Sequence, residues 1–248
     1  AEKTVSAALQ WLSIPKEKWF CWIHLWDPHD PYAPPEPFLT QYGNDPYSGE
    51  VAYVDFQLGL LFSELEKRQL IDKTLIILTG DHGESFGEHG ENYHGYFAYN
   101  TTLWVPLIIS APGVKAARVK DAVGHGDIFP TVCDLLGLEK PASLQGDTLL
   151  PFLRGKTRKA RPVYFEALEA NVNRGWAPIH GLIENGKKYI DSPIPELYDL
   201  ESDFGETKNL AAASDLPSYK KRLQEVMKLG ASSLAARAGR QTTDRETL

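Results

Sequence analysis

The sequence has little cysteine and no long apolar run. Its 248 residues include one methionine and only two cysteines, Cys21 and Cys133. Each cysteine lies alone in an apolar stretch, so we interpret both as buried thiols and expect no disulfide between them. No apolar run reaches about 18 residues, which predicts no membrane span in this chain. The start, AEKTVSAALQWL, lacks the basic-then-apolar layout of a signal peptide. We interpret Ala1 as an internal or processed start.

An excess of basic residues is absent as well. The chain has 26 Lys and Arg against 33 Asp and Glu, a formal net charge of −7. Nucleic-acid binding needs a basic stripe, so the sequence predicts no nucleic-acid partner. The short basic clusters at 156–161 and 220–222 are interpreted as solvated surface. The remaining composition, 42% hydrophobic and 24% charged, is that of a globular protein with one large domain or two small ones.

Helix and strand patterns alternate from residue 1 to about residue 155. Apolar residues at helical spacing predict three helices, at 4–12, 50–69 and 126–136. Apolar runs of strand length predict three strands, the first buried on both faces, at 19–26, 75–79 and 105–110. This alternation predicts an α/β fold with a mainly parallel sheet and flanking helices over residues 1–155.

The pattern changes after residue 155. A small antiparallel sheet with a terminal helix is predicted for 156–238, and residues 239–248 are expected to form a disordered tail. Its predicted parts are a strand at 161–168, a hairpin at 179–190 around Asn185-Gly186, a strand and acidic loop at 196–210, and an amphipathic helix at 217–237.

Two of the predicted strands end in loops with histidines and acids. The run WFCWIHLW leads to His29, and the run TLIILT leads to Asp81 and His82 between Gly80 and Gly83. Functional groups of a parallel sheet gather at the carboxyl ends of its strands. Asp81 and His82 can ligate one divalent metal, and we expect the two glycines to allow a sharp turn that presents them together. A catalytic metal needs at least three protein ligands, so others must lie elsewhere.

The residues alone leave the role of each histidine open. His24 lies inside an apolar run, which favours a satisfied core histidine, and His29 in its Pro-rich loop can be ordinary polar surface. His94 can cap local structure or bind an anion. The Asp81-His82 pair fits polar surface as well as a metal site. Five of the seven histidines fall between residues 24 and 94, and this concentration supports a metal- or anion-dependent site.

Four stretches, in order along the chain, resemble the sulfatase branch of the alkaline phosphatase superfamily. GDHGESFGEHGENYHGYFAYNTTLWVPLII is similar to the family's strand-loop-strand, and IHLWDPHDPYAPPEPF to its D-P-H loop. HGDIFPTVCDLLGL and ELYDLESDFGETKNLA are similar to a later helix and to the family's ending. The resemblance covers about residues 4–215. It implies an alkaline-phosphatase-like fold and a sulfuric ester hydrolase that acts on a sulfated small molecule or saccharide.

The resemblance also implies roles for individual residues. Asp81 and His82 match two ligands of one divalent metal, usually calcium in sulfatases, with zinc or magnesium as alternatives. His82 stands where many members have Asn. His29 and His94 match the catalytic pair that contacts the sulfate ester, with His94 standing where other members carry Lys. His24 is a further candidate for substrate binding.

The departures from the family pattern are large. The family's formylglycine nucleophile arises in a C/S-x-P-x-R motif, and this chain has neither that motif nor the two aspartates that complete the metal site. The chain therefore resembles the C-terminal half of the sulfatase fold. We expect the missing N-terminal half of the same protein to supply these groups, and the 248 residues alone to be inactive. Trp104 and Phe204 stand where the family usually has Arg and Pro.

Two other functions stay open. One is a phosphoethanolamine transferase or phosphodiesterase of the same superfamily, and the other is a non-catalytic half-fold module. The DPHDPY loop and the ELYDL ending favour the sulfatase. Loops at 32–47 and 170–176 are expected to line the substrate cleft, with Trp176 either in its wall or in a structural role. The compartment stays open, with periplasmic or extracellular placement favoured over cytoplasmic because bacterial sulfatases are commonly exported.

Overall fold

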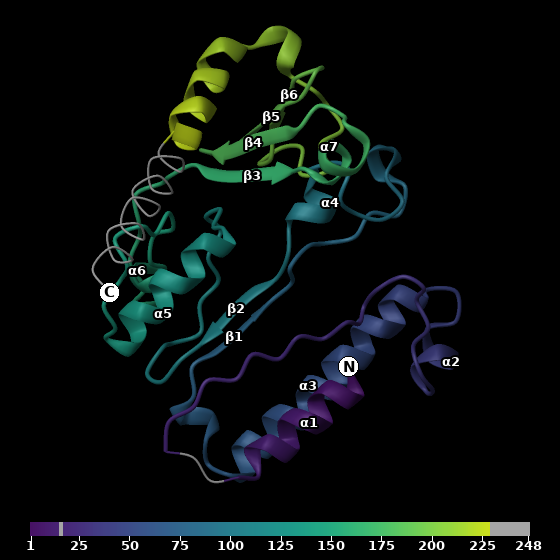
Figure 1. Cartoon of the computed structure of the whole chain (residues 1–248), viewed down its shortest axis with the longest axis vertical. Helices are drawn as coiled ribbons and strands as arrows, with labels where there is room; N and C mark the ends of the chain where they lie inside the picture. The colour runs from purple at the N-terminus through teal and green to yellow at the C-terminus, as the bar shows by residue number, and fades with distance from the viewer. Residues whose placement is uncertain (15–16, 229–248) are drawn as a thin grey trace, which may run out of the picture. The chain divides into compact units, whose positions relative to one another are not determined.

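The structure, a computed structural model, describes residues 1–14 and 17–228 (Figure 1). Its helices are α1 (Glu2–Leu12), α2 (Phe38–Tyr42), α3 (Pro46–Lys67), α4 (Asn100–Leu103), α5 (Ile128–Leu136), α6 (Leu150–Leu153) and α7 (Glu169–Arg174), followed by a helix over 216–228. Its strands are β1 (Ile76–Thr79), β2 (Leu107–Ser110), β3 (Val163–Ala167), β4 (Ile179–Glu184), β5 (Lys187–Asp191) and β6 (Glu196–Asp199). Across the described residues, no helix has the length and apolar character needed to cross a membrane.

The chain divides into two compact units. The first contains Ala1–Ile76 and Ile109–Pro112, and the second contains Ile77–Ile108 and the chain from Gly113 onward. The predicted division at residue 155 stays a prediction, and the expected tail at 239–248 lies outside the described residues.

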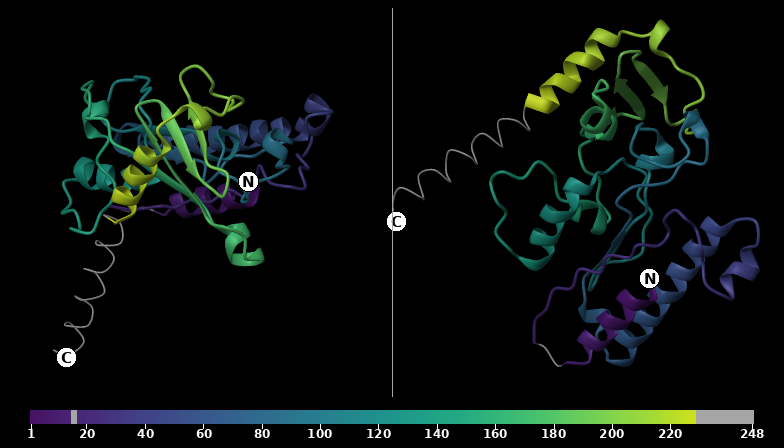
Figure 2. Two further views of the ribbon diagram at one scale, coloured as in Figure 1. Left: turned by 90° about the horizontal axis from the view of Figure 1, so that it is seen from above. Right: turned by 45° about the vertical axis from the view of Figure 1, so that its right-hand side comes forward.

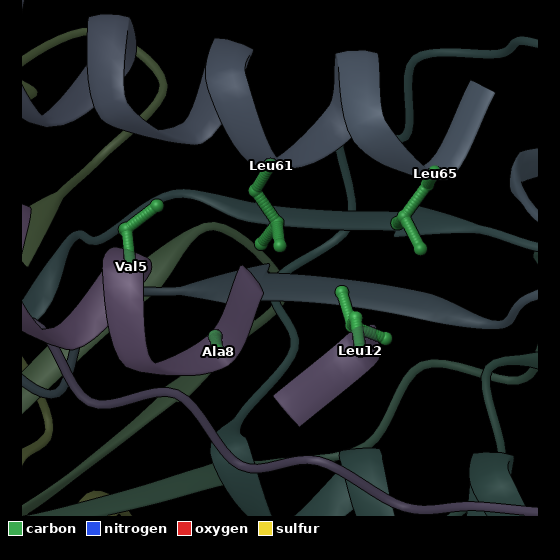
Figure 3. Close-up of a cluster of buried hydrophobic side chains, with 5 residues drawn as sticks. All are labelled: Val5, Ala8, Leu12, Leu61 and Leu65. Carbon is green, nitrogen blue, oxygen red and sulfur yellow. The ribbon is translucent and has the colours of Figure 1, made fainter. Parts of the chain in front are cut away.

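Two helices form the core of the first unit. α1 and α3 run side by side, and Figure 3 shows Val5, Ala8 and Leu12 of α1 directed toward Leu61 and Leu65 of α3. Residues three, four and seven apart lie on one face of a helix, so each helix presents an apolar stripe to the other. The predicted helices at 4–12 and 50–69 are thereby confirmed as α1 and α3.

Residues 19–26 are extended but form no strand, so the prediction of a strand buried on both faces is wrong. Every second side chain packs against the core of α1 and α3, among them Trp19, Ile23 and Leu25. This period of two is that of a β-strand. Within the described part of the chain, no neighbouring strand pairs with the segment.

The other face of this segment is open. The side chains of Phe20 and Trp22 are each 80% exposed, and that of Trp26 is 65% exposed. His24 lies on the same face and is also exposed, so the interpretation as a core histidine is wrong. We refer to the residues Phe20, Trp22, His24 and Trp26 as the open face.

The predicted antiparallel sheet is confirmed in the second unit. β3, β4, β5 and β6 pair in sequence order, each antiparallel to the next. Asn185 and Gly186, with φ of 52° and 73°, form the turn between β4 and β5, because a tight hairpin turn requires positive φ at both positions. The helix over 216–228 covers one face of this sheet, where Leu223 packs on Leu182 and Tyr189 (Figure 2).

The other sheet has two strands, β1 and β2. They confirm the strands predicted at 75–79 and 105–110, and α5, preceded by a 3-10 turn, confirms the helix predicted at 126–136. The described residues do not show the mainly parallel sheet that the alternation of helices and strands predicts. What they show is two separate sheets, of which the larger is antiparallel.

Candidate active site

The loop after β1 presents Asp81 and His82 to solvent, with side chains 72% and 41% exposed. The backbone N–H of Gly83 donates to the carbonyl oxygen of Thr102 in α4 at 2.7 Å. A Cβ on Gly83 would lie 2.2 Å from the carbonyl oxygen of Thr101. The structure therefore requires glycine here because the backbone passes so close to α4. Gly80 and Gly83 do not have a positive φ, so a left-handed backbone is not what requires glycine at these two positions.

His125 supports the same loop from behind. Its Nε2 lies 2.8 Å from the carbonyl oxygen of Gly80 and 3.3 Å from Oγ1 of Thr79. Because a carbonyl oxygen only accepts, Nε2 of His125 carries the proton and donates. His125 begins the stretch that resembles a later helix of the family, but that resemblance implied no role for it, and 45 residues separate it from Gly80.

The geometry of Asp81 and His82 suits a shared metal ion. Nδ1 of His82 lies 2.9 Å from the carbonyl oxygen of Gly83, so Nδ1 carries the proton and Nε2 keeps its lone pair. Metal-ligating histidines characteristically donate their other ring N–H in this way. Nε2 and Oδ2 of Asp81 lie 3.8 Å apart, which is within the reach of two metal–ligand bonds of about 2.0–2.5 Å each.

These two residues fit a metal but do not complete its site. Among the described residues, no group of three or more His, Cys, Asp or Glu side chains is arranged to hold a metal ion. The structure brings the predicted pair close together, and a metal site here would need at least a third ligand from elsewhere.

His94 joins this pair through its ring. The imidazoles of His94 and His82 stack with centroids 3.8 Å apart. Nδ1 of His94 lies 2.9 Å from Oε1 of Glu84, whose side chain is only 6% exposed. An ionised carboxylate only accepts, so Glu84 fixes a proton on Nδ1 of His94 and thereby orients the ring. The sequence analysis missed Glu84, although its place two residues after His82 was a usable signal.

Glu91 fastens the backbone that follows His94. Its carboxylate is 4% exposed, and Oε1 accepts from the N–H groups of Tyr96 at 2.8 Å and Phe97 at 3.3 Å. Oε2 is buried without a hydrogen-bond partner. Burial raises the pKa of Glu91, because desolvation penalises the charged form more than these two hydrogen bonds favour it.

A buried ion pair holds α4 in place. Nζ of Lys188 in β5 lies 2.5 Å from Oε1 of Glu206, and both side chains are almost fully buried. The same ammonium donates to Oδ1 of Asn100 at 3.2 Å, and the N–H of Asn100 donates to Glu206 at 2.5 Å. Asn100 begins α4, which contacts Gly83. The antiparallel sheet and the acidic loop after β6 therefore help to position the loop that carries Asp81 and His82.

His29 and His24 belong to the first unit. The backbone N–H of His29 donates to Oε2 of the buried Glu50 at 2.9 Å, and its ring stacks on Trp26 with centroids 4.0 Å apart. Nδ1 of His29 lies 2.6 Å from the carbonyl oxygen of Asp30, so Nδ1 carries the proton in the neutral ring. Among the predicted site residues, Asp81, His82 and His94 lie together in the second unit, whereas His24 and His29 lie in the first unit.

Two departures from the family pattern contact each other. The rings of Trp104 and Phe204 meet edge to face with centroids 5.0 Å apart. His89 stacks on Tyr99 with ring centroids 3.7 Å apart, and its Nε2 lies 3.2 Å from the carbonyl oxygen of Gly205. These aromatic contacts join the loop after β1 to the acidic loop after β6.

Comparisons with known proteins identify the family of this chain. The sulfatase family model matches residues 1–138, and the model described as "N-sulphoglucosamine sulphohydrolase, C-terminal" matches residues 87–232. The chain belongs to the sulfatase family.

Its curated relatives are sulfatases from animals and bacteria. The chain is 34% identical to arylsulfatase K of Homo sapiens over 179 residues, which cover 66% of this chain and 33% of the relative. It is 33% identical to the choline-sulfatase of Rhizobium meliloti, covering 66% and 32%. It is 33% identical to the N-acetylglucosamine-6-O-sulfatase of Bacteroides thetaiotaomicron, covering 76% and 35%. The chain therefore spans about one third of the length of these relatives.

Solved structures share the fold. The phosphonate monoester hydrolase of Agrobacterium radiobacter, at 25% identity, aligns over 92% of this chain and 60% of its own with a TM-score of 0.75. A protein in complex with its substrate D-glucosamine-2-N,6-O-disulfate, at 29% identity, aligns over 75% and 39% with a TM-score of 0.57.

Proposed function

We propose that this chain is part of a metal-dependent sulfuric ester hydrolase that cleaves a sulfated saccharide or small molecule. The observation that carries the proposal is the arrangement of Asp81 and His82, in which a backbone carbonyl leaves Nε2 of the imidazole free beside a carboxylate. The relatives named for choline, aryl and N-acetylglucosamine sulfate esters support the substrate class.

Residues of the second unit are assigned to two tasks, metal binding and contact with the ester. Asp81 and His82 would hold a divalent metal, calcium by the family resemblance, which would polarise the sulfuryl oxygens. His94, whose Nδ1 is fixed by Glu84, is assigned to the ester by the family resemblance. In its protonated form this ring donates to the ester oxygen on which negative charge develops. His29, which belongs to the first unit, is assigned to contact with a sulfate ester by the family resemblance alone.

The remaining catalytic groups are assigned to a part of the parent protein outside these 248 residues. They are the formylglycine nucleophile and two aspartate ligands, in line with a chain that spans about one third of its relatives' length. The open face supports this assignment, because three aromatic side chains at 65–80% exposure are unusual for a monomeric protein surface. β1 and β2 would then be pieces of a larger, mainly parallel sheet that the rest of the protein completes.

The test is sulfate release by the parent protein, produced in cells that form formylglycine. Asp81→Asn is expected to lower sulfate release by at least about 100-fold, because it removes a charged metal ligand. Asp121→Asn, at an exposed position outside the site, is the matched control and is expected to have no effect. Full activity of Asp81→Asn would overturn the metal assignment, and a parent protein that turns over no ester would favour the non-catalytic module.

A phosphorus ester is the second candidate substrate. The similarity to the phosphonate monoester hydrolase favours it, since that enzyme aligns over nearly the whole chain. Asp81 and His82 provide an oxygen and a nitrogen ligand, a set that suits zinc as well as calcium. Titrating the metal-depleted parent protein with each ion, and assaying aryl sulfate and phosphonate monoester in parallel, separates the two. Higher catalytic efficiency on the phosphonate would replace the sulfatase proposal.

A further inference from the structure

An arginine without an acidic partner lies beside the loop of His94. Arg174, the last residue of α7, donates from Nη2 to the hydroxyl of Tyr96 at 3.1 Å, and its guanidinium carbon lies 5.6 Å from the centre of the Tyr96 ring. Within the described residues Arg174 forms no salt bridge, and its side chain is exposed. A guanidinium has five N–H donors, so most of them stay available to a ligand.

A neighbouring tryptophan is held in place without being buried. The N–H of Trp176 donates to the carbonyl oxygen of Ala170 at 3.2 Å, and its own carbonyl accepts from Asn171 at 2.6 Å. Both bonds fix the Trp176 backbone to α7. The ring lies 6.2 Å from the Tyr96 ring and is 55% exposed. A purely structural tryptophan would bury this surface, whereas a fixed, exposed ring offers a stacking platform.

The backbone connects these three residues to the active site. Tyr96 follows His94 by two positions, and Gly95 between them has φ of 104°. A Cβ on Gly95 would lie 2.2 Å from Oε2 of Glu169, the first residue of α7. α7 therefore packs directly against the loop of His94, and Arg174 and Trp176 approach that loop at Tyr96.

We propose that Tyr96, Arg174 and Trp176 form a subsite for a sugar ring that carries a second anionic group, in addition to the sulfate ester that is cleaved. The proposal rests on the proposed function for the place of the cleaved ester. The aromatic rings stack on the apolar face of the sugar, and the guanidinium forms a charge-assisted, bidentate contact with the second anion. That anion is a sulfate or a carboxylate, which both match the planar fork of arginine.

The binding test uses the 248-residue chain and three disaccharides. A sulfated, uronate-containing disaccharide from heparin carries both anions, its fully desulfated form keeps only the carboxylate, and lactose carries no charge. The indole N–H signal of Trp176, assigned by Trp176→Phe, is expected to shift with the charged probes and not with lactose. If the signal shifts with both charged probes, the second anion is a carboxylate. If it shifts with the sulfated probe alone, the second anion is a sulfate. Equal shifts with all three, or none, would overturn the proposal.

Variants then test the arginine itself. Arg174→Gln is expected to weaken binding of the preferred charged disaccharide by about tenfold, because it removes a charge-assisted contact. Tyr96→Phe, which keeps the ring and releases the guanidinium, is expected to weaken it less. Arg118→Gln, at an exposed site with the same change in charge, is the matched control. Equal loss in Arg118→Gln and Arg174→Gln would show general charge attraction and overturn the subsite.

The parent protein separates this proposal from the proposed function. The measured quantity is the ratio of kcat/KM for a doubly anionic sulfated sugar to kcat/KM for 4-nitrophenyl sulfate. Arg174→Gln is expected to lower this ratio about tenfold, and Arg118→Gln to leave it unchanged. An unchanged ratio in an active Arg174→Gln enzyme would overturn the subsite alone. A parent protein that cleaves neither ester would overturn the proposed function, and the binding test on the chain still decides the subsite.

Discussion

The imidazole rings of His82 and His94 stack with centroids 3.8 Å apart and planes inclined by 29°. This contact joins a residue assigned to the metal to a residue assigned to the sulfate ester. Behind it, Gly83 and Glu84 fix the Nδ1 protons of His82 and His94, respectively. The two rings are therefore oriented together, and we expect a change at either ring to alter the position and environment of the other.

Removing the ring of His82 tests this unit. In His82→Ala, we expect the ring signals of His94 in an NMR spectrum to move and the calcium dissociation constant of the chain to rise at least about tenfold, since a ligand and a stacking partner are both lost. His180→Ala, in β4, is the control for loss of a histidine elsewhere. Unchanged His94 signals in His82→Ala would contradict the coupling of the two rings.

Glu84 is expected to act on turnover through His94. Glu84→Gln keeps an oxygen that can accept from Nδ1 but loses the charge, and Glu84→Ala loses both. In the parent protein we expect kcat to fall in that order, with Glu84→Ala lower by at least about tenfold and KM little changed. Glu139→Gln, exposed and outside the site, serves as the control. A rise in KM with unchanged kcat would show that Glu84 acts only on binding.

The buried pair of Lys188 and Glu206 should dominate the stability of the second unit. Burial lowers the pKa of Lys188 to about 8 despite its acidic partner. Lys188→Met leaves Glu206 charged and unpaired, which is expected to lower the free energy of unfolding by about 3–5 kcal/mol. The double variant Lys188→Met with Glu206→Gln should recover part of this loss, because no buried charge remains.

Lys187 provides the matched comparison for that experiment. It is the neighbouring residue and pairs with Asp199 at 2.6 Å, but at the surface. Lys187→Met is therefore expected to cost less than about 1 kcal/mol in urea unfolding. Equal losses in Lys187→Met and Lys188→Met would contradict the role given to the buried pair.

Glu91 should make stability depend on pH in a predictable direction. Its pKa is raised from the ordinary value of 4.5 by burial. The stability that Glu91 contributes is therefore fully present below pH 4.5 and is lost as pH rises through the raised pKa. The free energy of unfolding of the natural chain, minus that of Glu91→Gln, should fall as pH rises from 4.5 toward neutrality. A difference that is flat or rises with pH would show that burial does not control this carboxyl group.

The open face should behave differently in the chain and in the parent protein. Trp22→Thr is expected to reduce self-association and hydrophobic-dye binding of the 248-residue chain, because it removes a side chain that is 80% exposed. In the parent protein the same change should lower the folded yield, since the face is covered there. Ile194→Thr, at 78% exposure in the second unit, is the control. Improved yield of the parent Trp22→Thr variant would contradict a covered face.

Local sequence patterns predicted the local structure. The Asn185-Gly186 turn, the helices α1 and α3 and the strands of the antiparallel sheet follow from propensity and spacing within short segments. The segment 19–26 was predicted wrongly as a buried strand, because a run of apolar residues does not reveal whether a partner strand is present. Its alternation of packed and exposed side chains appears only when α1 and α3 cover one of its two faces.

Only the local part of the candidate site could be predicted from the sequence. Asp81, His82 and His94 lie in one quoted stretch of sequence, and the structure brings them together. The role of His125 depends on a contact with Gly80 across 45 residues, and that of Lys188 on a contact with Asn100 across 88 residues. Such contacts arise from tertiary packing, so neither pattern nor spacing marks them.

Sulfate release should be measured for the parent protein and for the 248-residue chain in one assay, before and after removal of divalent metal. We expect the parent protein to release sulfate, metal removal to abolish this activity, and the chain alone to release none. Sulfate release by the pure chain, or metal-independent release by the parent protein, would contradict the assignment of this site as one wall of a metal-dependent sulfatase.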